Sequence, residues 1–313
     1  MSNPSAIFLM GPTASGKTDL AVELCAHLPC DIISVDSAMV YRGMDIGTAK
    51  PSQELRRRIT HRLIDIRDPA DTYSAAQFRL DALREMDEIR AHGRSPLLVG
   101  GTMLYFRALQ RGLSVLPSAD TALRARLDAQ AQEIGWAALH ERLAGIDPVA
   151  ARRIHRNDPQ RIQRALEVYE LTSRTATELY AQNTAETWDK PVLKLIVVPS
   201  DRAVLHDRIA RRFSAMLEQG FLEEVEGLRR RGDLDEETPA LRAVGYRQAW
   251  GHLVGKTNCE EMAKSAIIAT RQLAKRQFTW LRSEPDAVWF DSLDKDVFNT
   301  VTKFCANALS ARQ

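Results

Sequence analysis

A glycine-rich segment near the start of the chain constrains the fold more than any other feature. Residues 11–18 read Gly-Pro-Thr-Ala-Ser-Gly-Lys-Thr and fit the pattern G-x-x-x-x-G-K-[ST] in full. The apolar run at 6–10 precedes this segment, and apolar residues with helical spacing follow it. A strand, a glycine-rich loop and a helix in this order predict a phosphate-binding loop, or P-loop.

The chemistry of such a loop is specific. Its glycines let successive backbone N–H groups point inward, and the N-terminus of the following helix favours anions at the same place. We expect a diphosphate or triphosphate to lie there, with Lys17 against its terminal oxygens and the Thr18 hydroxyl on a bound Mg²⁺. The alternative is a glycine turn with a lysine on the surface. The loop does not tell which phosphate compound binds or what attacks it. The predicted phosphate-binding residues are Gly11, Pro12, Thr13, Ala14, Ser15, Gly16, Lys17 and Thr18.

Bulk composition narrows the class of protein. The chain has 313 residues, of which 44% are hydrophobic and 27% charged, as in globular proteins that fold in water. No apolar run approaches the roughly 20 residues of a membrane span, and no basic stretch followed by an apolar one opens the chain. We therefore expect a cytoplasmic protein without a membrane partner. The four cysteines show no C-x-x-C pairing, so reduced, buried thiols and no zinc are expected.

The order of predicted elements indicates an α/β fold: a P-loop NTPase-like parallel sheet flanked by helices, with a helical insertion domain. Between about 117 and 188 no convincing strand occurs. We assign 1–113 and 190–313 to the α/β core with its C-terminal helices, and 114–189 to the insertion. The predicted strands are 6–10, 31–35, 61–66, 96–99, 192–198 and 287–290, and the stretch from Gly43 to Pro51 is expected to be irregular. The predicted helices are 74–92, 119–134, 136–144, 148–155, 159–180, 202–219, 222–231, 241–253, 260–281 and 295–309.

Two polar residues follow predicted strands of this sheet. Asp36 comes directly after the strand at 31–35, and Thr102 follows Gly100 and Gly101 at the end of the strand at 96–99. Because parallel strands bring their carboxyl ends to one edge, both residues are expected beside the P-loop. Asp36 is either a ligand of the magnesium ion or a general base, and the sequence alone does not distinguish these two roles. A turn aspartate is the structural alternative.

Basic residues gather in two places. From Ala150 to Arg164 there are five arginines and one acid, Asp158, and the segment 270–282 has basic residues and no acid. Either cluster alone fits a solvated helix face, but two of them beside a phosphate loop favour a polyanionic partner. A third set lies on the helix at 202–219, where an arginine could clamp a diphosphate.

Longer motifs carry a resemblance to a known family. The motifs are GPTASGKT at 11–18, SVDSAMVYR at 34–42, DIGTAKP at 45–51, HRLID at 61–65, VGGTMLY at 99–105, NDPQRIQRALE at 157–167, RAVGYRQ at 242–248 and TRQLAKRQ at 270–277. They resemble those of bacterial tRNA dimethylallyltransferases and span nearly the whole chain.

This resemblance implies a reaction and roles. A dimethylallyl group would pass from dimethylallyl diphosphate to N6 of the adenine 3′-adjacent to the anticodon, in tRNAs that read codons starting with U. Asp36 would be the general base, and Thr102 would help to hold the adenine and the transferring group. The P-loop with Mg²⁺ on Thr18 and the arginine Arg212 would hold the diphosphate leaving group. A monomer would bind the anticodon stem-loop, whose adenine must leave its stack to react. The expected tRNA contacts are Asp36, Ser37, Ala38, Met39, Thr102, Arg124, Gln160, Arg161, Ile162, Gln163, Arg164, Leu241, Arg242, Ala243, Val244, Gly245, Tyr246, Arg271, Lys275 and Arg276.

Two alternatives remain open on the residues alone. A small-molecule or nucleotide kinase would also have a P-loop and a helical lid, and it would turn over ATP. An RNA-binding switch would show nucleotide-dependent tRNA affinity without forming a product. The transferase interpretation is preferred because it gives a role to the P-loop, the Gly-Gly-Thr turn and both basic clusters.

Overall fold

The chain divides into two compact units in a computed structural model that describes residues 4–114, 116–182 and 187–310. The larger unit is formed by Met1–Gln110 with Asp189–Gln313, and the smaller one is Arg111–Trp188. The insertion expected at 114–189 occupies nearly the same stretch as the smaller unit. Within the described ranges, no helix is both long and apolar enough to cross a membrane.

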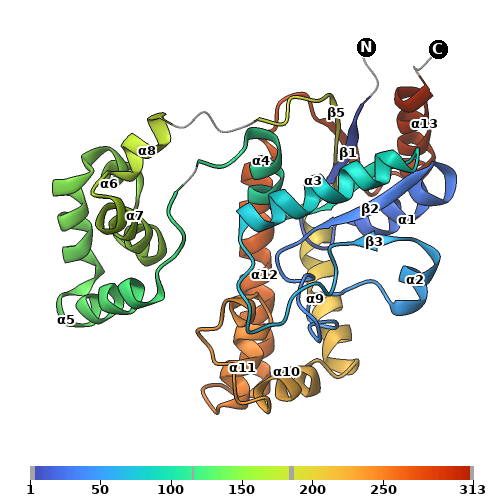
Figure 1. The fold of residues 1–313 in the computed structure, drawn as a ribbon. Coiled ribbons are helices and arrows are strands. Elements are labelled where there is room, and N and C mark those ends of the chain that lie inside the picture. The colour runs from blue at the N-terminus through green and yellow to red at the C-terminus, as the bar shows by residue number, and fades with distance from the viewer. Residues whose placement is uncertain (1–3, 115, 183–186, 311–313) are drawn as a thin grey trace. The chain divides into compact units, whose positions relative to one another are not determined.

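A six-stranded parallel sheet forms the centre of the larger unit (Figure 1), which confirms the predicted α/β class. The order across the sheet is β3-β2-β4-β1-β5-β6, and all five neighbouring pairs are parallel. Strands β1 and β2 are buried along their whole length, as a sheet covered on both faces requires. The strands are β1 (Ala6–Met10), β2 (Cys30–Val35), β3 (His61–Arg62), β4 (Ser95–Gly100), β5 (Val192–Val198) and β6 (Val288–Asp291).

Helices cover both faces of this sheet. On one face, Ile7 and Leu9 of β1 pack in one cluster with α1 (Lys17–His27) and α13 (Val297–Ser310). On the other face, the ring of Phe8 lies 5.0 Å from that of Phe106 in α4 (Met103–Arg111). The remaining helices of the unit are α2 (Gln53–Arg58), α3 (Ala75–Ala91), α9 (Arg202–Glu218), α10 (Phe221–Arg229), α11 (Tyr246–Leu253), α12 (Cys259–Leu281) and the short 3₁₀ turn Pro239–Arg242.

A second core lies away from the sheet. It joins α9, α10, α11 and α12 to the segment from Val40 to Met44, and it contains the fully buried rings of Phe221 and Tyr246. These rings pack edge to face with their centroids 5.1 Å apart. The loop after β2 therefore packs against the C-terminal helices.

The smaller unit is helical in its described residues. It contains α5 (Thr121–Ile146), α6 (Pro148–Arg153), α7 (Pro159–Thr172) and α8 (Ala176–Gln182), around a core that includes Leu127, Leu143 and Leu166. The backbone of α5 departs from helical geometry at Gly135, where φ is +82°. That break separates the two predicted helices 119–134 and 136–144.

Four local predictions were wrong. The helix expected at 159–180 ends at Thr172, because Ser173 takes a left-handed conformation with φ +53°. The helix expected at 241–253 begins only at Tyr246, after Gly245 with φ +96°. The strand expected at 61–66 ends at Arg62, because Leu63 takes a left-handed conformation with φ +61°. The short helix α2 was not predicted, because it buries no residue and so leaves no apolar periodicity in the sequence. All four cysteines are free thiols, but Cys259 is exposed rather than buried.

Candidate functional site

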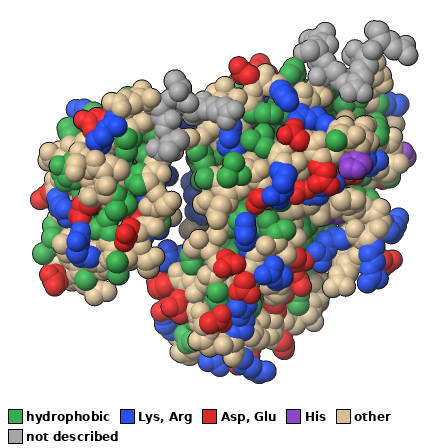
Figure 2. Space-filling model, in the orientation of Figure 1, with side chains coloured by type: hydrophobic (Ala, Val, Ile, Leu, Met, Phe, Trp, Pro, Cys, Tyr) green, Lys and Arg blue, Asp and Glu red, His purple; other side chains and the backbone are tan. Residues whose placement is uncertain are grey.

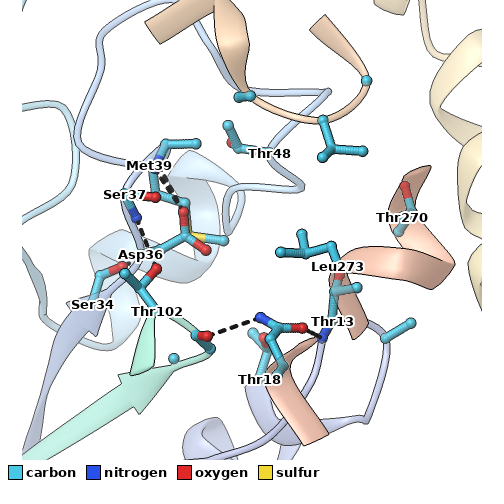
Figure 3. Close-up of a pocket in the computed structure, with 18 of the residues that line it drawn as sticks. Thr13, Thr18, Ser34, Asp36, Ser37, Met39, Thr48, Thr102, Thr270 and Leu273 are labelled. Carbon is cyan, nitrogen blue, oxygen red and sulfur yellow. Dashed lines mark hydrogen bonds between the residues drawn. The ribbon is translucent and has the colours of Figure 1, made fainter. Parts of the chain in front are cut away.

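A cavity of about 490 Å³ opens at the carboxyl ends of β1, β2 and β4, and we call it the cleft. Figure 3 shows the side chains of Thr18, Asp36 and Thr102 among those that line it. All lining residues belong to the larger unit. The cleft lies at the edge of the sheet where ligands of open α/β folds bind.

The P-loop folds as its pattern predicts. It follows β1 directly, and Ala14 and Gly16 take positive φ values of 60° and 91° before α1 begins at Lys17. No side chain caps the N-terminus of α1, so its first N–H groups remain available to a ligand. A Cβ on Gly11 would come within 2.5 Å of the Val197 carbonyl oxygen, which explains a glycine there. Of the loop, Thr13, Ala14, Lys17 and Thr18 line the cleft, whereas the Ser15 hydroxyl is buried without a hydrogen-bond partner.

The loops after β2 and β4 bring Asp36 and Thr102 together. The Thr102 hydroxyl accepts a hydrogen bond from the Ser37 backbone N–H at 3.3 Å, and the Thr102 N–H donates to the Val35 carbonyl at the same distance. The Asp36 oxygen Oδ1 accepts from the N–H groups of Ala38 at 2.8 Å and Met39 at 3.2 Å. These two bonds hold the Asp36 carboxylate, and among the described residues its Oδ2 has no hydrogen-bond donor.

Two cations face Asp36 in the cleft. Burial, the largest cause, and the charge of Arg212 lower the pKa of Lys17 to about 8, although the charge of Asp36 raises it. Burial also lowers the pKa of Arg212, against the charges of Asp36 and Asp19. Arg212 donates to the Thr48 carbonyl at 3.4 Å, and Lys17 to the Pro12 carbonyl at 3.0 Å. Two partly desolvated cations beside a P-loop form a strong site for a dianion.

The other arginines of α9 lie elsewhere. Arg208 donates to the Ser292 hydroxyl at 3.3 Å and lines a second cavity of about 610 Å³ that also touches the P-loop. Arg211 is exposed and pairs with Asp207 on its own helix. Of the four arginines of α9, which include Arg202, only Arg212 lines the cleft.

The donor set of the cleft fits magnesium. The Thr18 hydroxyl and the Asp36 carboxylate are hard oxygen donors that both line it. In the part of the chain that the structure describes, no three His, Cys, Asp or Glu residues form a metal-binding group. Mg²⁺ commonly takes one or two protein oxygens and fills its other positions with water and substrate phosphates, so this sparse set suits it.

The segment 242–246 forms one wall of the cleft. The Leu241 and Tyr246 side chains are fully buried, and the Tyr246 hydroxyl donates to Glu224 at 2.6 Å. A tRNA contact by Leu241 or Tyr246 would therefore involve the backbone. Arg242 is exposed and forms an ion pair with Glu237. Ala243, Val244 and Gly245 complete this wall.

The basic residues of α12 do not act as one set. Arg276 lines the cleft, while Lys275 is exposed and Arg271 lies near the His206 carbonyl, 3.5 Å away. Figure 2 shows acidic and basic side chains interspersed on the face in view, without separation into one basic surface.

In the smaller unit, a buried carboxylate organises the predicted contacts. Glu167 is fully buried and binds Arg124 through two hydrogen bonds of 2.8 and 3.0 Å and Arg164 through one of 2.6 Å. Arg161 pairs with Asp158 and is 69% exposed at its side chain. Ile162 is buried in the core, so it cannot offer its side chain to RNA. Gln160 is exposed, and Gln163 donates to Asp128.

Three residues with many contacts escaped the sequence reasoning: Gln277, Glu224 and Glu167. Gln277 bonds the P-loop and the Gly101 turn, and Glu224 binds the loop that contains Gly47. Gln277 and Glu224 lie on helices far along the chain from the loops that they bind, and Glu167 binds Arg124 of another helix as well as Arg164 of its own. A single polar residue on a helix has no local signature of such a contact.

Comparisons with known proteins agree with one another. The family model described as IPP transferase matches residues 39–284. The chain is 59% identical over 310 residues to the tRNA dimethylallyltransferase of Thioalkalivibrio sulfidiphilus (strain HL-EbGR7), covering 99% of this chain and 97% of the relative.

Solved structures similar to this chain are also tRNA isopentenylpyrophosphate transferases. The crystal structure of the full-length tRNA isopentenylpyrophosphate transferase from Bacillus halodurans is 37% identical, with a TM-score of 0.71 and coverage of 97% and 96% of the two chains. The tRNA delta(2)-isopentenylpyrophosphate transferase from Staphylococcus epidermidis is 30% identical with a TM-score of 0.70, covering 98% and 99%. A eukaryotic dimethylallyltransferase acting on tRNA shares the fold, with a TM-score of 0.79 at 24% identity, covering 96% of this chain and 77% of that one.

Proposed function

Since this chain belongs to the IPP transferase family, its activity is the transfer of a dimethylallyl group to tRNA, and we propose that the cleft carries out this reaction. Family membership decides against the kinase and the RNA-binding switch. The observation that supports the cleft is the meeting of a P-loop, two cations and a free carboxylate oxygen at one sheet edge.

We propose that the donor is dimethylallyl diphosphate and that its diphosphate lies on the P-loop. The N–H groups at the start of α1, Lys17 and Arg212 would bind its oxygens. Mg²⁺, held by Thr18 and the diphosphate, would supply further neutralisation of the leaving group when bound. These groups stabilise the negative charge that appears as the allylic C–O bond breaks, and its electron pair goes to the diphosphate.

We propose that the acceptor is N6 of the adenine 3′-adjacent to the anticodon, in tRNAs that read codons starting with U. N6 forms the new bond to the allylic carbon and loses one proton. Asp36 accepts that proton on Oδ2, because Oδ1 is held by two backbone N–H groups. Thr102, fixed by Ser37, lies beside this carboxylate and orients the adenine.

A stacked adenine cannot present N6 to Asp36 inside the cleft, so we propose that the adenine leaves its stack to react. The residues proposed to hold the flanking RNA are the exposed ones of the predicted set, above all Arg161, Arg242, Lys275 and Arg276. We further propose that the chain works as a monomer on the anticodon stem-loop in the cytoplasm, where tRNA is found.

The test uses purified protein, Mg²⁺, unmodified tRNA and radiolabelled dimethylallyl diphosphate, with ATP added to a parallel tube. We expect label in the tRNA without ATP, and none when that adenine is replaced by guanine. Asp36→Asn should bind the diphosphate ester as the wild type does and lower the single-turnover rate at least a hundredfold. A wild-type rate in this variant would remove Asp36 from the role of base. Phosphate release from ATP without labelled tRNA would refute the transferase.

A further inference from the structure

Gln277 of α12 joins the two halves of the cleft. Its Oε1 accepts a hydrogen bond from the Thr13 backbone N–H at 3.0 Å, and its Nε2 donates to the Gly101 carbonyl at 2.9 Å. Figure 3 draws both bonds as dashed lines between the P-loop and the turn that carries Thr102. We infer that Gln277 is a positioning residue that fixes the leaving-group site relative to the base.

The bonds of Gln277 continue into the catalytic pair. Thr102 follows Gly101 directly, and its hydroxyl accepts from the Ser37 N–H beside Asp36. Hydrogen bonds and short pieces of backbone therefore connect the diphosphate loop, through Gln277 and the Gly101–Thr102 turn, to the Ser37 backbone next to Asp36. The only other backbone bond in the described residues that ties these loops is Gly11 N–H to the Gly100 carbonyl, at 3.3 Å and still at the strand ends. Beyond the strands, Gln277 makes the connection.

The fit of the amide is close. A Cβ on Gly101 would come within 2.3 Å of Nε2 and 3.0 Å of the Gly11 carbonyl oxygen, so the turn approaches Gln277 without a side chain. The contact needs one donor and one acceptor at the end of one side chain, which an amide provides and a carboxylate does not. Because the Thr13 N–H already donates a hydrogen bond to Gln277, we infer that it holds the P-loop in place and does not bind the substrate phosphate.

A positioning role predicts a particular kinetic result. Loss of Gln277 leaves the N–H groups at the start of α1, Lys17 and Arg212 in place, so affinity for the diphosphate ester should stay within about threefold of the wild type. The distance between the allylic carbon and the Asp36 carboxylate would no longer be fixed. A displacement near 1 Å costs up to about a hundredfold in rate. We expect the single-turnover rate at saturating tRNA and dimethylallyl diphosphate to fall by about ten- to a hundredfold.

The experiment compares Gln277→Met, which keeps the length of the side chain without its polar atoms, with Gln272→Met on the exposed side of the same helix. Gln277→Glu keeps the acceptor for Thr13 and loses the donor to Gly101, and it should be slowed as well. If Gln277→Met fails to fold, Gln277→Glu decides. The measurements are the single-turnover rate of label transfer and the affinities for tRNA and for a non-hydrolysable dimethylallyl diphosphate analogue.

The inference rests on the proposed function, and different experimental results would refute each of them. No labelled tRNA from the wild type would refute the function. A wild-type enzyme that transfers label and a Gln277 variant with the same rate would overturn the inference alone. A Gln277 variant whose tRNA affinity falls tenfold while its rate at saturation stays normal would also overturn it, since Gln277 would then be a tRNA contact.

Discussion

A charged lysine held inside the cleft should make the protein less stable than it could be. Burial and the charge of Arg212 lower the pKa of Lys17 from an ordinary 10.5 to about 8, and Asp36 offsets only part of this. The folded state then binds fewer protons than the unfolded one between these pH values. The free energy of unfolding therefore rises with pH through this range, and at neutral pH Lys17 destabilises the fold.

The size of this effect follows from the shift. One pKa unit corresponds to about 1.4 kcal/mol, so the fall from 10.5 to about 8 corresponds to about 3 kcal/mol at pH 7. The hydrogen bond from Lys17 to the Pro12 carbonyl stabilises the folded state by about 1 kcal/mol and offsets part of this cost. Lys17→Met should thus raise the free energy of unfolding by about 2 kcal/mol near pH 7. The gain should fall to near zero at about pH 10, because Lys17 is then neutral in the folded state and the cost of removing the proton from the unfolded lysine has dropped to about 1 kcal/mol.

The same substitution should abolish diphosphate binding, because removing one partner of a desolvated charge pair costs about 2–5 kcal/mol. The assay is equilibrium urea unfolding of wild type and Lys17→Met near pH 7 and near pH 10, with Lys303→Met as the control for an exposed lysine. Binding of the dimethylallyl diphosphate analogue is measured on the same samples. A variant that is no more stable than the wild type near pH 7, or whose advantage is the same near pH 10, would refute the reasoning.

Two further predictions concern residues outside the reaction. Glu224 accepts from three backbone N–H groups at 45–47 and from the Tyr246 hydroxyl, so Glu224→Ala should lower the free energy of unfolding by about 3 kcal/mol in urea, whereas Glu223→Ala should change it little; a loss under about 1 kcal/mol would contradict this. Arg161→Ala should weaken tRNA binding and flatten the logarithmic salt dependence by about one unit; an unchanged slope would make Arg161 part of a solvated helix face.

The local sequence pattern and one rule of sheet topology were enough to predict which residues meet at the edge of the sheet that forms the cleft. The P-loop needed only its own residues and the strand and helix beside it. The meeting of Asp36 and Thr102 followed from the common edge of parallel strands, and the pairing of Val35 with Gly100 shows why it holds. Each residue lies one or two positions beyond a strand whose neighbour is fixed by the sheet.

The contacts that complete the cleft could not be predicted in this way. Gln277 is separated from Thr13 by 264 residues and Glu224 from Asp45 by 179. Both contacts depend on how the C-terminal helices pack on the sheet, and a side chain's partner across that packing has no trace in local spacing. The backbone break at Gly245 was hidden for a related reason, since the apolar residues on both sides keep a helical period.

The arginines of the smaller unit show why a count of charges misleads. In the sequence, Arg161 and Arg164 look equivalent, yet Arg164 is bound to the buried Glu167 together with Arg124. Burial by itself would raise the pKa of Glu167, but the hydrogen bonds from these two arginines hold it below its ordinary value. Glu167 therefore stays ionised and cancels one of their two charges. Arg124, Arg164 and Glu167 together therefore carry one net positive charge. Glu167 also fixes the positions of the two guanidinium groups. In the proposed complex with tRNA, the cluster would orient the RNA as well as attract it, and the salt dependence of tRNA binding should be smaller than five arginines suggest.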